Sequence, residues 1–98
     1  MTRRLYVTAV PSHEVGGATW IATWVEGAVR DRVGEGWSPC GPADPDTVAG
    51  WEVWVLSQLR STDLARYTWQ LVSALPVGSI QGDRAPHGVR LVFEPLAG

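Results

Sequence analysis

The chain of 98 residues contains no lysine and no asparagine, and it has a single cysteine and a single phenylalanine. One cysteine cannot form an internal disulfide, and nothing in the sequence indicates an oxidising compartment. No apolar run approaches the ~20 residues that a membrane-spanning helix needs. The apolar segment 5–10, which follows the basic residues 3–4, is too short for the hydrophobic region of a signal peptide. These absences predict a cytoplasmic protein that has no membrane partner.

An excess of positive charge is also missing. Ten acidic and eight basic residues give a formal net charge of −2 and a pI near 5.5, and every basic residue is an arginine. Such a chain has no general basic field to attract phosphate backbones, so nucleic-acid binding is not expected. The plentiful glycine, alanine, valine and proline, together with the missing lysine and asparagine, indicate a GC-rich bacterial or phage coding sequence.

Tryptophan, in contrast, is abundant. Four of the six tryptophans form two close pairs, Trp20 with Trp24 and Trp51 with Trp54. A buried tryptophan hides roughly 150–250 Å² and still needs a partner for its indole N–H, and a domain of this length has a small core. We therefore predict that some indoles reach the surface, and we assign a binding role to Trp20, Trp24, Trp37, Trp51 and Trp54. The alternative is that all six tryptophans are packing residues.

Alternating apolar residues predict strands over residues 4–10 and 89–94, which we expect to pair with each other. Residues 51–59 fit either a strand or a helix, and Gly50 with the β-branched content favours a strand. A further short strand is predicted at 36–38.

Two helices are predicted. Ile21, Val25, Val29 and Val33 repeat every four residues and predict an amphipathic helix over residues 18–33. The second helix is predicted over 64–75. Ser, Thr and Asp at 61–63 can cap its start, Pro76 follows its end, and its residues are spaced three, four and seven apart at Leu64, Thr68, Leu71, Val72 and Leu75.

The order of these elements predicts one α+β domain spanning residues 1–98, a ferredoxin-like two-layer sandwich with two helices on one face of an antiparallel sheet. The second face of such a sheet is uncovered, which predicts a homodimer. The Gly- and Pro-rich residues 34–50 are predicted to form a long loop, which is a common place for function.

Residues 28–59 resemble small phage-encoded proteins of the phage ABA sandwich type. The resemblance lies in Val-Gly-Glu-Gly-Trp at 33–37 and Asp-Thr-Val-Ala-Gly-Trp-Glu-Val at 46–53. It covers a third of the chain and implies that the Trp-Glu-Val stretch is helical, in contrast to the strand that the β-branched content of 51–59 favours. It implies no function.

Chemical motifs are sparse. Cys40 with His13 or His87 is the only candidate nucleophile–base set, and no motif surrounds the cysteine. Possible metal ligands are His13, Glu14, Asp44, Asp46 and His87. No pair among them has the spacing of a known metal site, so we predict no catalytic residue, metal or cofactor.

The sequence therefore favours a small non-enzymatic interaction protein that binds another protein through its tryptophan-bearing surface and the 34–50 loop. The acidic residues Asp44, Asp46 and Glu52 would suit a partner bearing arginine or lysine. One alternative is a small-molecule-binding dimer with an aromatic pocket, and another is an enzyme that uses Cys40 and a histidine.

Overall fold

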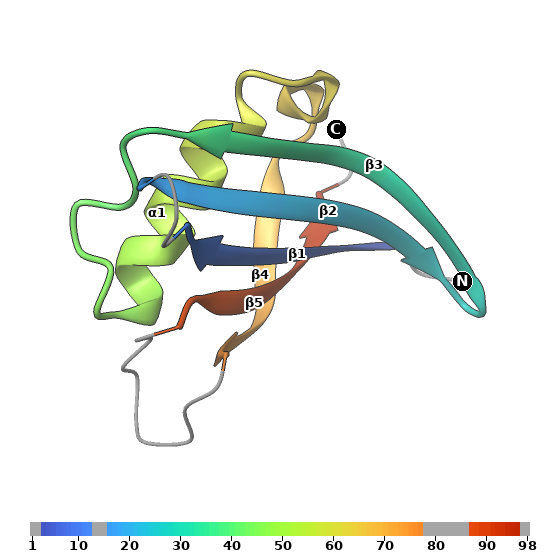
Figure 1. Cartoon of the computed structure of the whole chain (residues 1–98). Coiled ribbons are helices and arrows are strands. Elements are labelled where there is room, and N and C mark those ends of the chain that lie inside the picture. The colour runs from blue at the N-terminus through green and yellow to red at the C-terminus, as the bar shows by residue number, and fades with distance from the viewer. Residues whose placement is uncertain (1–2, 13–15, 78–86, 97–98) are drawn as a thin grey trace.

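The computed structural model describes residues 3–12, 16–77 and 87–96. In this part of the chain a five-stranded antiparallel sheet with the order β3-β2-β1-β5-β4 carries one α-helix and one 3-10 turn. The elements, in chain order, are β1 (Arg4–Pro11), β2 (Ala18–Glu26), β3 (Val29–Ser38), α1 (Val48–Leu59), η1 (Asp63–Arg66), β4 (Trp69–Pro76) and β5 (Val89–Pro95). Figure 1 shows α1 and η1 on one side of the sheet, and β4 crossing the direction of β2 and β3 because the sheet is strongly twisted.

This architecture corrects the predicted fold, because a ferredoxin-like sandwich with two helices does not fit a five-stranded sheet with one helix. The first and last strands are confirmed, and they pair antiparallel with Leu5 opposite Phe93. Two predicted helices and one predicted strand are wrong, each for a reason visible in the structure.

The predicted helix over 18–33 is the hairpin of β2 and β3. Residues four apart share one face of a helix, but they also share one face of a strand, whose side chains alternate with period two. Gly27, with φ of 60°, and Ala28 form a two-residue turn, where Glu26 pairs with Val29. Glycine at the first central position is typical of the type II′ turns that connect hairpins.

The strand predicted over 51–59 belongs to helix α1, as the phage resemblance implied. Thr47 caps the helix: its hydroxyl accepts from the Gly50 N–H and donates to the Asp44 carboxylate. The buried residues of α1 have helical spacing; they are Trp51, Trp54, Val55 and Leu59. The strand was predicted because β-branched valines are typical of strands.

The helix predicted over 64–75 is replaced by η1 and strand β4. Thr62 does act as a cap, but η1 ends after one turn. Leu71 and Ala74 lie opposite Phe93 and Leu91, and the register shifts between them. Because of this β-bulge, Leu71 faces the core whereas Leu75, opposite Arg90, lies on the other face, so the two do not share the single face that helical spacing predicts.

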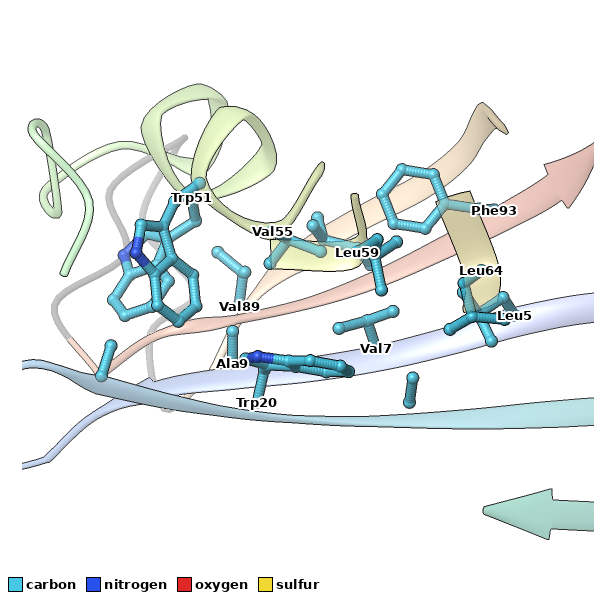
Figure 2. Packing of buried hydrophobic residues seen from close by; sticks show 14 residues of the cluster. Leu5, Val7, Ala9, Trp20, Trp51, Val55, Leu59, Leu64, Val89 and Phe93 are labelled. Carbon is cyan, nitrogen blue, oxygen red and sulfur yellow. The ribbon is translucent and has the colours of Figure 1, made fainter. Parts of the chain in front are cut away.

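The core lies between α1 and the face of the sheet that it covers. In Figure 2, Val55 and Leu59 point from α1 toward Val7, and the indole of Trp20 lies flat along the sheet. Ideal Cβ atoms on Gly34 and Gly36 of β3 would lie 3.1 Å and 2.7 Å from that indole. The two glycines therefore make the room in which Trp20 lies.

The predicted 34–50 loop is shorter than expected. Residues 34–38 belong to β3, which includes the short strand predicted at 36–38, and α1 begins at Val48. The connection between them is residues 39–47. Within the described residues, no helix is long and apolar enough to cross a membrane.

Candidate functional site

The face of the sheet opposite α1 is the largest candidate surface. Residues directly opposite each other in antiparallel strands point to the same face, so the observed registers define its members. No described helix or loop covers this face, which we call the open face. Its members are Arg4, Tyr6, Thr8, Val10, Thr19, Ile21, Thr23, Val25, Arg30, Arg32, Glu35, Trp37, Gln70, Ser73, Leu75, Arg90, Val92 and Glu94.

A hollow of about 670 Å³ lies in the middle of the open face. It is lined by Tyr6, Thr8, Ile21, Thr23, Arg30 and Arg90. The floor comes from the neighbouring strands β1 and β2, whereas the two arginines come from β3 and β5 on either side. The hollow thus combines three hydroxyl groups, one apolar side chain and two guanidinium groups.

The four arginines of the open face differ in their partners. Arg4 Nε donates to a carboxylate oxygen of Glu94 at 2.9 Å, and Arg32 lies 3.8 Å from Glu35. Arg30 and Arg90 are exposed and form no ion pair with any other residue that the structure describes. No described carboxylate therefore occupies either of these two guanidinium groups beside the hollow.

Trp37 is the one predicted binding tryptophan that stands well out of the surface, with 49% of its area exposed. It lies at a corner of the open face, opposite Thr19. Its indole N–H donates to the Gly16 carbonyl at 3.0 Å, which holds the ring in place. An aromatic side chain fixed in advance loses little entropy when it binds, which is typical of interface anchors.

Three other predicted binding tryptophans, Trp20, Trp51 and Trp54, are buried in the core. The indole N–H groups of Trp51 and Trp54 donate to the carbonyls of Pro45 and Cys40 at 2.8 and 2.9 Å. The helix thereby holds the 39–47 connection through two indoles, and these side chains are unavailable at the surface.

The fifth, Trp24, is half-buried in an aromatic cluster on the α1 side of the sheet. Its ring centroid lies 5.5 Å from that of Tyr67 and 5.4 Å from that of Trp69. The Arg3 guanidinium lies 4.1 Å from the centre of the Trp24 ring, a cation–π geometry.

Beside this aromatic cluster is a recess of about 290 Å³, lined by Leu56, Leu59, Arg60, Ala65, Tyr67, Thr68 and Trp69. This volume is near the lower limit for a small-molecule site.

Tyr67 in this cluster accepts hydrogen bonds from Arg66 at 3.1 Å and from Arg3 at 3.3 Å. Hydrogen bonding and charge from Arg66, with a smaller contribution from Arg3, lower the pKa of Tyr67 below the ordinary 10.0. Because the folded value is the lower one, ionisation favours folding; this contribution is complete above pH 10 and is lost as the pH falls through the folded value.

We expect the tyrosinate absorbance of Tyr67 to appear at higher pH in the Arg66→Ala variant than in the parent protein. The absorbance component should be missing from Tyr67→Phe, which serves as the assignment control. Identical titration curves for the parent and Arg66→Ala would contradict the described contact.

The residues considered for catalysis or metal binding are only partly described by the structure. Cys40 and His87 are both exposed, and the carbonyl of Cys40 accepts the Trp54 indole N–H. His13 and Glu14 lie outside the described residues. Among the residues that are described, no group of three or more His, Cys, Asp or Glu side chains is placed to hold a metal ion.

The residues that line the hollow were not predicted as a site from the sequence. Tyr6 and Thr8 alternate with the buried residues of the correctly predicted first strand, so the alternation alone indicates that they point away from the core. Arg30 and Thr23 were assigned to a helix, and that error separated them from Arg90. Only the sheet order brings these residues together.

No family model, no curated protein and no solved structure matches this chain. A function can therefore be assigned only from the geometry and chemistry of the chain's own surface.

Proposed function

We propose that the chain is a small binding protein that recognises a protein partner through the open face. The observation that carries the proposal is a five-stranded sheet with α1 on one face and no described element on the other. Sheets covered on one side expose the second face either to water or to a partner.

The composition of the open face supports recognition. Ile21, Trp37 and Leu75 are 40%, 49% and 59% exposed, although each is a large apolar residue. Hydroxyl and charged side chains lie between them, as in non-obligate interfaces, which mix apolar anchors with polar groups. Trp37 supplies the rigid aromatic anchor.

A second copy of the chain is a less suitable occupant of this face. Four arginines and only two glutamates lie on it, so two copies packed face to face would bring like charges together. The predicted homodimer would then need another surface. The exposed edge strands β3 and β4 would be such a surface, because edge strands can pair with another chain.

Cross-linking in the cells that make the protein tests the proposal. With a photoreactive amino acid at Ile21, we expect a cross-linked product with one other protein. The same group at Val53, which is 71% exposed on α1, is the control and should not give this product. Truncating an aromatic anchor commonly costs about 2 kcal/mol or more, so adding Trp37→Ala should remove most of the Ile21 product.

Three results would contradict the proposal. They are equal products from Ile21 and Val53, an Ile21 product with twice the mass of the chain, and an Ile21 product that is insensitive to Trp37→Ala in a variant that still melts cooperatively.

A further inference from the structure

The charge of the open face is opposite in sign to that of the whole protein. The chain carries a formal charge of −2, whereas the open face carries four arginines and two glutamates. The positive charge is therefore concentrated on one face of an otherwise acidic protein. Such separation directs oppositely charged partners to one surface.

Within this face, Arg30 and Arg90 are suited to bind an anion. Both line the hollow, and neither has a carboxylate partner among the described residues, in contrast to Arg4 and Arg32. A guanidinium group binds carboxylates through paired N–H donors. The hydroxyl groups of Tyr6, Thr8 and Thr23 line the same hollow and are further donors.

The separation of the two arginines favours an extended acidic segment over a single small anion. Arg30 and Arg90 lie on β3 and β5, three strand positions apart, and the registers also offset them by four residues along the strands, so their backbones are on the order of 20 Å apart. Alternate side chains of an extended peptide are about 7 Å apart. Arginine side chains that lean over the hollow can therefore each bind a carboxylate of one acidic segment.

We propose that the hollow of the open face binds an acidic segment of the partner protein, with Arg30 and Arg90 each holding a carboxylate. This proposal rests on the proposed function and adds the chemistry of the partner. Nucleic acid fits less well, because its binding depends on neutralising several phosphates, whereas the open face has four arginines and two of them lie beside glutamates.

Fluorescence anisotropy of a labelled oligoglutamate peptide tests this site at low ionic strength. We expect binding that weakens as salt is added, and an affinity about fivefold lower in Arg30→Gln and in Arg90→Gln. The double variant should lose about 20-fold, since the two arginines act on different carboxylates. Arg60→Gln makes the same charge change at the end of α1, outside this face, and should stay within about twofold of the parent.

The other outcomes overturn the proposal. They are an absence of oligoglutamate binding, an equal loss in Arg60→Gln, tighter binding of oligolysine, and tighter binding of single-stranded RNA. If inorganic phosphate displaces the peptide at the same concentration of negative charge, the site binds any anion and does not recognise an extended acidic segment.

The failure of this proposal is distinguishable from that of the proposed function. If the Ile21 cross-link persists in the Arg30→Gln/Arg90→Gln double variant, the open face binds a partner but not through an acidic segment. If the Ile21 cross-link is absent while oligoglutamate binds in an arginine-dependent way, the hollow is an anion site and the protein partner is wrong.

Discussion

Replacing Trp51 by alanine is expected to lower the free energy of unfolding by about 3–5 kcal/mol, the usual cost of truncating a buried tryptophan. Trp51 is 1% exposed, its ring meets that of Trp54 edge-on at 5.6 Å, and its N–H donates to the Pro45 carbonyl. The variant loses the packing of the helix on the sheet and one of the two indole bonds that hold the 39–47 connection. Urea unfolding followed by far-ultraviolet circular dichroism measures the change without relying on tryptophan fluorescence.

Trp37→Ala is the matched control, since the same atoms are removed from a half-exposed ring that makes one exposed hydrogen bond. It should cost about 1 kcal/mol or less. Trp51→Phe separates packing from hydrogen bonding, because it keeps a ring but leaves the Pro45 carbonyl without its donor, at a cost of about 1–3 kcal/mol. Equal losses from Trp51→Ala and Trp37→Ala would show that the core is not packed as described.

The second large effect is expected at Gly17, where replacement by alanine should destabilise the protein by about 2–5 kcal/mol. Gly17 has φ of 70°, and a Cβ atom on it would overlap the carbonyl oxygen of Ser38. The backbone leading into β2 therefore lies against the end of β3 in a space that excludes any side chain. A methyl group must separate these two segments, and thermal or urea unfolding would report the loss.

Gly16→Ala provides the control. Gly16 has nearly the same φ, 75°, but a Cβ atom there meets no described atom within 4 Å. It should cost only the conformational strain, about 1–2 kcal/mol. Similar losses at the two positions would mean that φ alone matters and that the close approach of Gly17 to Ser38 is absent.

The two glycines also bear on recognition. The Gly16 carbonyl holds the Trp37 indole, and Gly17 fixes the distance between this turn and the end of β3. A binding defect caused by Gly17→Ala in a sample that is still folded would therefore reflect a displaced Trp37.

Part of the candidate site was predictable. Exposure of Trp37 agrees with its position in a Gly- and Pro-rich stretch without other large apolar residues, and the outward direction of Tyr6 follows from simple alternation. The burial of Trp51 and Trp54 was not predictable, because an indole with an N–H suits a core position and an interface equally well. Only the tertiary structure shows that both indoles lie under α1, where the carbonyls of Pro45 and Cys40 accept their N–H groups.

Local pattern was enough to predict the two strands that pair at the centre of the sheet, since β1 alternates with period two and β5 does so apart from the buried Val92. Residue type was also enough to predict that Thr62 caps the start of a helical turn. Long-range contacts made the choice between helix and strand for 18–33, 51–59 and 64–75, because the spacing of apolar residues there satisfies both periods. The pairing of β2 with β3, the packing of α1 against the sheet and the pairing of β4 with β5 resolved these ambiguities, and the resulting sheet order placed Arg30 and Arg90 beside one hollow.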